Sequence, residues 1–180
     1  MRLIAIDPGI INLGIAVLDT PVNLIWCDTL HADDPGTNED THPTMRPPTT
    51  DPIVRWYRRI RGYCAKYSPD QLAYELLQPQ GRFRGAANEG QLWQQVGMLH
   101  IISGAIPCQP RGYTPRIWRR RLTGNQYAGD HEVNAVVAAR TGIDLIARYG
   151  VTRASHMLDA AGVALIAAED FYQTELRNEA

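Results

Sequence analysis

Three apolar segments follow one another within the first thirty residues, and only short turns separate them. They are RLIAID at 2–7, NLGIAVLD at 12–19 and PVNLIWCDT, running into Leu30, at 22–30. The turns contain Asp7-Pro8-Gly9 and Thr20-Pro21, residue types that are typical of turns. Because turns this short join antiparallel strands, we expect the chain to open with a three-stranded antiparallel sheet.

Helical and strand patterns alternate in the rest of the chain, after a segment at 31–50 that is rich in Pro, Thr, Asp and Gly and is expected to be a surface loop. We expect helices from Asp51-Pro52 over about four turns, at 88–105, from Pro115 to Gly124, from Asp130 to about Arg148 and from Ser155 to about Ala168, and strands at 71–76 and near 107–113. This order predicts an α/β fold, a mixed sheet covered by helices. The length of 180 residues fits a single domain, 1–180.

Several protein classes are disfavoured by the sequence. No apolar run approaches the ~20 residues needed to cross a bilayer, and the N-terminus lacks the features of a secretory signal. The three cysteines are far apart and have no CxxC spacing, which argues against a disulfide framework or a zinc knuckle. We therefore expect a cytoplasmic protein with no membrane partner.

The net charge of −1 conceals a basic middle between acidic ends. Residues 52–121 contain twelve Arg or Lys against three acids, which is a local charge of +9. The densest cluster is Arg111, Arg116, Arg119, Arg120 and Arg121, with no acid among them. A charged helix face is commonly just solvated, but this density favours phosphate binding and an anionic partner.

Three acids stand in apolar surroundings where packing alone would not place them. Asp7 ends the first apolar strand, Glu75 lies in LAYELL, and Asp159 lies in HMLDAAGVALIAA. A buried carboxylate is costly unless it is paired, hydrogen-bonded or bound to a cation. Any one of them could reach solvent or cap an element, but three together favour a metal site. His156 precedes Asp159 by three residues, so both side chains share a helix face.

These segments, taken in order, resemble the RuvC-type Holliday junction resolvases of the RNase H-like superfamily. The matching segments are IAIDPGIINLGIAVLD, AYELLQ, YTPRIWRRRLTGN and SHMLDAAGVALIA. Each segment alone is weak evidence for this family, but the order and separation of the four segments make their combination specific for it. The resemblance implies an RNase H-like mixed sheet, three antiparallel strands followed by parallel strands, with flanking helices. The stretch GIINLGIA is similar to phage, poxviral and mitochondrial relatives.

The resemblance also implies a site and an activity. Asp7, Glu75 and Asp159 fall on the family's metal-binding acids, and His156 falls where relatives have Asp or His, so we expect two Mg²⁺ ions there, with Mn²⁺ as a substitute. His156 is expected to be a metal ligand or an acid/base group. The implied reaction is phosphodiester hydrolysis that resolves four-way DNA junctions by paired symmetric nicks. A homodimer is implied as well, with the helix at 88–105 as its contact.

The segment after Glu75 contains Arg82-Phe83-Arg84 between glycines. Phe83 can fold back on the core. Alternatively, as in loops of this family, it stacks on a base at the branch point while Arg82 and Arg84 bind phosphates. We expect the second role.

The family pattern is not followed throughout. Where bacterial members usually have lysines around the Thr-Gly segment, this chain has Arg119, Arg120 and Arg121, then Asp130 and His131. Alternatives are a nuclease acting on other branched DNA or on RNA–DNA hybrids, and a catalytically silent junction-binding protein, against which the three acids argue. An actin- or hexokinase-like nucleotide-binding protein is disfavoured because the chain has no second phosphate-binding half.

Overall fold

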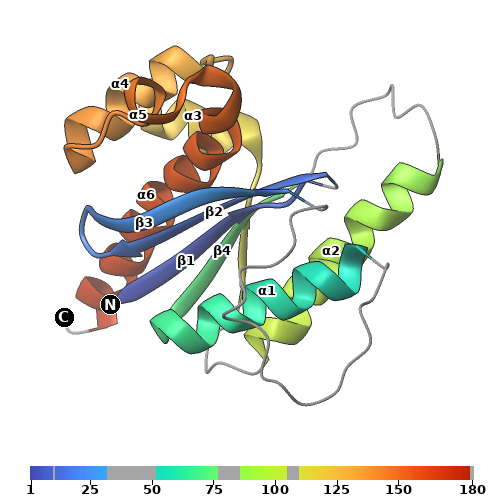
Figure 1. The fold of residues 1–180 in the computed structure, drawn as a ribbon. Coiled ribbons are helices and arrows are strands. Elements are labelled where there is room, and N and C mark those ends of the chain that lie inside the picture. Colours follow the sequence, from blue (N-terminus) through green and yellow to red (C-terminus); the bar gives the residue numbers. More distant parts are fainter. Residues whose placement is uncertain (10, 32–51, 77–85, 105–109, 179–180) are drawn as a thin grey trace.

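The centre of the structure is a mixed five-stranded sheet in the order β3-β2-β1-β4-β5 (Figure 1). The computed structural model describes residues 1–9, 11–31, 52–76, 86–104 and 110–178. The strands are β1 (Arg2–Asp7), β2 (Asn12–Asp19), β3 (Asn23–His31), β4 (Gln71–Glu75) and β5 (Arg111–Tyr113). The first three are antiparallel, β4 is parallel to β1, and β5 is parallel to β4. The expected antiparallel opening and mixed α/β sheet are confirmed.

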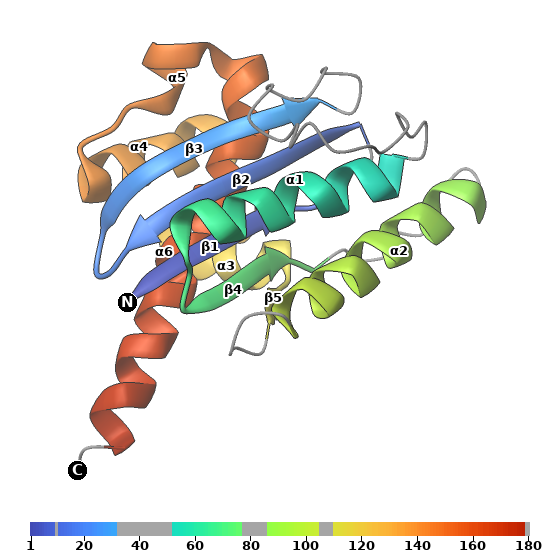
Figure 2. The same cartoon turned by 60° about the horizontal axis from the view of Figure 1, so that its bottom comes forward.

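Helices cover both faces of this sheet (Figures 1 and 2). One face carries α1 (Pro52–Tyr67) and α2 (Ala86–Ser103); the other carries α3 (Pro115–Thr123), α4 (Asp130–Thr141), α5 (Leu145–Tyr149) and α6 (Val151–Asn178). The long helix α6 contacts β1, β2, β3 and β4. None of the helices within the described ranges has the length and apolar character needed to cross a membrane.

Strand alternation divides the core into two layers. Leu3 and Ala5 are fully buried on the side of α6, whereas Ile4 and Ile6 are fully buried on the side of α1 and α2. Because successive side chains of a strand point to opposite faces, the next odd-numbered residue of β1, Asp7, faces α6. The same alternation on β4 puts Ala73 in the α6 layer and directs Glu75 to that side.

The expectation of one helix from Asp130 to about Arg148 is wrong. Helix α4 ends at Thr141 because Gly142 adopts a left-handed conformation (φ 75°) and its N–H donates to the carbonyl of Ala138. A separate short helix, α5, then starts behind Asp144, whose side chain accepts a hydrogen bond from the N–H of Ala147.

The expected bounds of the last helix are also wrong. Helix α6 begins at Val151, directly after Gly150 (φ 79°), so Ser155 lies inside the helix rather than at its cap. It continues past Ala168 because Phe171 extends its buried face. Helix α3 ends as predicted at Gly124, which has φ 83°. Most of the segment 31–50, together with Asp51 and residues 105–109, lies outside the described residues.

Candidate active site

Three carboxylates come together at one end of the sheet, and we call Asp7, Glu75 and Asp159 the acidic site. Asp7 and Glu75 are the last residues of two neighbouring parallel strands, whose register pairs Ile6 with Tyr74 one residue earlier. Both side chains point to the face of the sheet that α6 covers, and Asp159 lies on α6. The topology thus brings these three acids to the same end of the sheet.

Burial and mutual repulsion leave this site short of positive charge. Asp7 is 7% exposed and Glu75 is 8% exposed. Burial, with the nearby charges of Asp7 and Asp159, raises the pKa of Glu75 to about 8. Burial and the charge of Asp7 raise the pKa of Asp159 to about 7. Carboxylates that interact in this way favour a bound proton or a bound cation.

Helix α3 supplies a partner to two of the acids. The indole N–H of Trp118 donates to Oε2 of Glu75 at 2.9 Å. The next residue, Arg119, donates from Nη2 to Oδ1 of Asp159 at 2.6 Å and from Nη1 to the carbonyl of Ala128 at 2.7 Å. Trp118 is fully buried, and its contact with Glu75 was not predicted from the sequence.

His156 is the partner of the third acid. Its Nδ1 lies 2.6 Å from Oδ2 of Asp7, and this hydrogen bond raises the pKa of the imidazole. The charges of His156 and Asp159, three residues apart on α6, also affect each other's pKa. Each acid of the site thus has a hydrogen-bonded partner.

Two glycines allow these partners to approach. Gly14 of β2 is the antiparallel partner of Asp7, and a Cβ there would collide with the backbone carbonyl of His156. Gly162 of α6 lies under Trp118, and a Cβ there would be 2.5 Å from the indole ring. Both positions therefore require the absence of a side chain if α6 and α3 are to reach the acidic site.

The donor set suits a hard divalent cation such as Mg²⁺, because carboxylate oxygens are its preferred protein ligands. The raised pKa values of Glu75 and Asp159 also point to missing positive charge. Within the described ranges, no three His, Cys, Asp or Glu side chains already surround a common point as a metal site would. His156 is hydrogen-bonded to one oxygen of Asp7 and Arg119 to one oxygen of Asp159, and the second oxygen of each carboxylate could be a cation ligand.

Asp130, at the start of α4, is a further charge near this site that sequence reasoning did not select. Its charge contributes to the raised pKa values of Asp159 and His156, although it is not their largest cause. It is the first residue of the helix, directly after the N-cap residue Gly129. Only the packing of α4 beside α6 brings it near the acids.

The arginines predicted to bind phosphate have different environments. Arg119 lies in the acidic site. Arg121 donates to Asp170 at 2.7 and 3.0 Å, and the guanidinium of Arg111 lies 4.2 Å from the ring centroid of Phe171. Arg116 and Arg120 are exposed on α3. The predicted DNA-binding residues Arg82, Phe83 and Arg84 lie outside the described residues, so their role stays a prediction.

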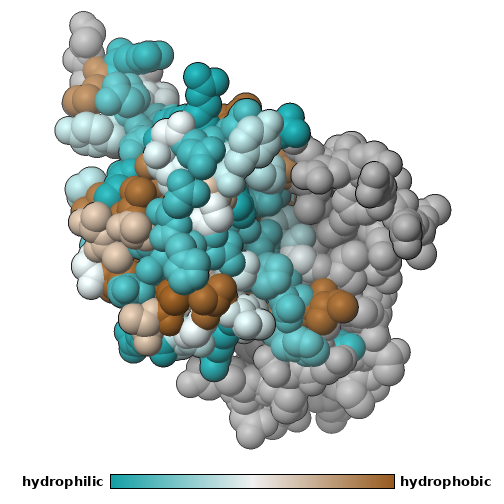
Figure 3. All heavy atoms as spheres, turned by 90° about the horizontal axis from the view of Figure 1, so that it is seen from above, coloured by the Kyte–Doolittle hydropathy of each residue, from teal (hydrophilic) through white to brown (hydrophobic). Residues whose placement is uncertain are grey.

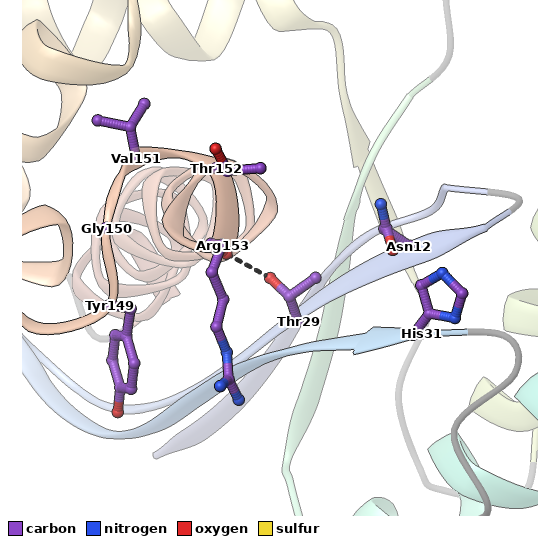
Figure 4. Close-up of a pocket in the computed structure, with 8 residues that line it drawn as sticks. All are labelled: Asn12, Thr29, His31, Tyr149, Gly150, Val151, Thr152 and Arg153. Carbon is purple, nitrogen blue, oxygen red and sulfur yellow. Dashed lines mark hydrogen bonds between the residues drawn. The ribbon is translucent and has the colours of Figure 1, made fainter.

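A pocket of about 570 Å³ opens beside the start of α6 (Figure 4). Asn12, Thr29 and His31 of β2 and β3 line one side, and residues 149–153 line the other. The hydroxyl of Thr29 donates to the carbonyl of Arg153 and joins the two sides. The pocket lies within two helical turns of His156 but includes none of the three acids.

Compared by sequence, the chain matches no protein-family model and no curated protein. Its fold, in contrast, matches solved structures of resolvases. RuvC of T. thermophilus in complex with a Holliday junction substrate has a TM-score of 0.70 at 22% identity, over 96% of this chain and 94% of that chain. At these values the likeness establishes a shared fold.

Two further structures have the same fold. The fowlpox virus Holliday junction resolvase has a TM-score of 0.54 at 14% identity, over 94% of this chain and 99% of that chain. The yeast mitochondrial Holliday junction resolvase Ydc2 has a TM-score of 0.57 at 15% identity, over 92% of this chain and 75% of that chain. The fold is therefore RNase H-like as in RuvC, and the resemblance inferred from the motifs is confirmed at the level of fold.

Proposed function

We propose that this protein is a metal-dependent DNA endonuclease that resolves four-way junctions by paired symmetric nicks. The observation that carries the proposal is the acidic site: Asp7 and Glu75, buried at the ends of β1 and β4, and Asp159, partly buried on α6, gather three carboxylates that suit a divalent cation. Burial and the neighbouring carboxylates raise the pKa of Glu75 and of Asp159. The fold adds support, because it matches a RuvC structure in complex with a Holliday junction substrate.

Asp7, Glu75 and Asp159 would hold two Mg²⁺ ions, with His156 as a further ligand or an acid/base group. Mn²⁺ is expected to substitute for Mg²⁺. When bound, such a pair of ions activates a water molecule and stabilises the leaving 3′ oxygen. No covalent intermediate with a Ser or Cys nucleophile is needed.

The chain's own residues prepare this site. Trp118 fixes the orientation of the Glu75 carboxylate and, being fully buried, excludes water from the side of the core. The hydrogen bond to His156 fixes the Asp7 carboxylate. Arg119, which holds Asp159 by a hydrogen bond, would be placed to bind a phosphate oxygen of DNA at this site.

The remaining arginines would hold the DNA backbone. Arg116 and Arg120 are exposed on α3, on the side of the helix opposite the buried Trp118, so phosphates bound there would lie along the outer side of the helix whose Arg119 reaches Asp159. Arg111 and Arg121, engaged with Phe171 and Asp170, are expected to contribute through the local positive field more than through direct contacts.

Paired nicks on a two-fold symmetric junction require two equivalent sites, so we expect a homodimer. Helix α2 offers an apolar surface for this contact. It exposes Trp93 and Ile101, which are 56% and 67% exposed. These residues are eight apart, so they lie on one side of the helix.

The substrate class is tested by incubating the purified protein and Mg²⁺ with labelled four-way junction, linear duplex, flap and RNA–DNA hybrid. The proposal predicts paired nicks in the junction at rates far above those on the other substrates. Preferential cutting of the flap or of the hybrid would replace it with one of the other nuclease functions. No cutting of any substrate in Mg²⁺ or Mn²⁺ would remove the nuclease proposal.

A further inference from the structure

An exposed aromatic side chain lies on the loop 124–129, which connects α3 to α4. Tyr127 is 70% exposed there, and Ile117 of α3 is 55% exposed. We call Arg116, Ile117, Arg120 and Tyr127 the α3 ledge. The helices α3 to α5 lie together at the top of Figure 1, and Figure 3 shows that the described surface seen from this side is largely hydrophilic with small hydrophobic patches.

Internal hydrogen bonds fix the loop that carries Tyr127. Oδ1 of Asn125 accepts from the N–H of Tyr127 at 3.0 Å, and the carbonyl of Asn125 accepts from the N–H of Ala128 at 3.2 Å. The carboxylate of Glu132 accepts from Nδ2 of Asn125 and from the N–H of Gly129. Tyr127 is therefore held outward on an ordered loop, and its exposure does not result from a lack of local structure.

The same loop is connected directly to the acidic site. Arg119 donates to the carbonyl of Ala128, the residue after Tyr127, and with its other terminal nitrogen to Asp159. The guanidinium of Arg119 thus links the loop that carries Tyr127 to a carboxylate of the acidic site. A DNA strand bound at the acidic site would leave it either past this loop or on the other side of the site.

One guanidinium lies over the exposed ring, and a second exposed arginine follows on the same helix. The guanidinium carbon of Arg116 lies 5.8 Å from the ring centroid of Tyr127. Arg120 follows one helical turn later and is exposed, and α3 contains no acid. The loop 124–129 contains no acid; of the two acids in the first turn of α4, Asp130 and Glu132, the second accepts hydrogen bonds from Asn125 and Gly129. An aromatic face flanked by cations matches an unpaired nucleotide, whose base stacks and whose phosphates pair with arginine.

We propose that the α3 ledge binds an unpaired nucleotide of the DNA strand that leaves the acidic site, with Tyr127 stacked on its base and with Arg116 and Arg120 on the flanking phosphates. This inference rests on the proposed nuclease function and adds a base contact to it. Because stacking does not distinguish among bases, the contact selects an unpaired strand rather than a sequence. It therefore favours substrates whose strands separate near the cut.

The test compares Tyr127→Ala, Tyr127→Phe and Tyr172→Ala, each in the cleavage-deficient Asp7→Asn protein with Mg²⁺ present. Tyr172 is a matched control, because it is also an exposed tyrosine but lies thirteen residues beyond Asp159 on α6, about 20 Å along the helix. The probe is a four-way junction with 2-aminopurine placed in turn at each position next to the crossover. Affinity and fluorescence are measured, together with the sedimentation of each free protein.

We expect Tyr127→Ala to bind the junction about tenfold more weakly and to lose the fluorescence change at one position, because one stacked base is lost. Tyr127→Phe and Tyr172→Ala should behave like the parent protein. Equal binding by Tyr127→Ala and Tyr172→Ala would overturn the inference while leaving the nuclease proposal intact. A change in sedimentation of Tyr127→Ala with unchanged DNA binding would overturn it in favour of a protein contact. If the Asp7→Asn protein with Tyr127 unchanged binds no junction, the proposed function fails, and the inference fails with it.

Discussion

Arg119 and Asp159 are joined by a hydrogen-bonded ion pair with an Nη2 to Oδ1 distance of 2.6 Å. Both side chains are largely buried, so the guanidinium supplies in the metal-free protein part of the positive charge that the acidic site lacks. Removing one member of a buried pair leaves the other uncompensated.

Arg119→Ala is therefore expected to destabilise the metal-free protein at pH 8, by about 1–3 kcal/mol, because Arg119 lowers the pKa of Asp159 and the buried carboxyl must take up a proton or stay unpaired once the guanidinium is gone. Adding Asp159→Asn should restore most of this loss, because the uncompensated charge is gone. Chemical denaturation in EDTA measures both effects, with Arg120→Ala on the exposed side of the same helix as the control. A double variant no more stable than Arg119→Ala would show that the pair is not the cause.

The metal-free protein should lose stability as the pH rises from 5.5 to 8.5. Glu75 and Asp159 have pKa values of about 8 and about 7 in the folded protein, so the unfolded chain releases these protons at lower pH and is favoured as the pH rises. The raised pKa of His156 acts in the same direction, because its bound proton is lost as the pH rises through that value. Ion-paired acids such as Asp19, whose pKa is lowered by the hydrogen bond from Arg2, titrate below this range.

Melting curves in EDTA and in excess Mg²⁺ measure this effect. Mg²⁺ should raise the Tm more at pH 8.5 than at pH 5.5, because a bound cation replaces the protons. Equal shifts at both pH values would mean that the cation does not bind at these acids.

Gly162→Ala should weaken the site without touching an acid. The new Cβ would lie 2.5 Å from the ring of Trp118, so the indole must shift and its hydrogen bond to Glu75 lengthens. Overpacking of this kind costs about 1–3 kcal/mol. Gly97→Ala in α2 is the control, because that position has open space and alanine is favoured in a helix. Unchanged tryptophan fluorescence and stability in Gly162→Ala would contradict the predicted displacement.

Ile101→Asp should abolish the proposed dimer while preserving the fold, because Ile101 is exposed on α2 and a carboxylate there would oppose its copy across a two-fold contact. Sedimentation equilibrium at micromolar concentration compares this variant with Leu176→Asp, which changes an exposed apolar residue of α6. The same oligomeric state for both variants would place the contact elsewhere or show that the protein is a monomer.

Much of the site could be predicted from the sequence because it depends on local periodicity. Strand alternation puts Asp7 on the same face as Leu3 and Ala5, and a helical spacing of three joins His156 to Asp159. The fold followed from the order of the apolar segments. The role of Gly14 could also have been predicted from the sequence, since a glycine inside a strand pattern often marks a close backbone approach.

The contacts from α3 could not be predicted in this way. Arg119, Arg120 and Arg121 are consecutive and chemically identical, and only the packing of α3 against α6 decides that Arg119 reaches Asp159 and Arg121 reaches Asp170. Trp118 has the apolar surroundings of a core residue, and its indole hydrogen bond depends on the tertiary position of Glu75. The split between α4 and α5 was missed because the apolar spacing continues across Gly142, whose left-handed conformation ends the first helix.

The central claim, that the acidic site performs metal-dependent DNA cleavage, is tested most directly by single-turnover cutting of a labelled four-way junction in Mg²⁺. Asp7→Asn, Glu75→Gln and Asp159→Asn are compared with Asp19→Asn, a carboxylate-to-amide change in the same sheet whose partner, Arg2, starts β1 at the end remote from Asp7. We predict paired nicks from the parent protein and from Asp19→Asn, and none from the three site variants, which should still bind the junction through the arginines. Near-normal nicking by any one of the three site variants would contradict the claim.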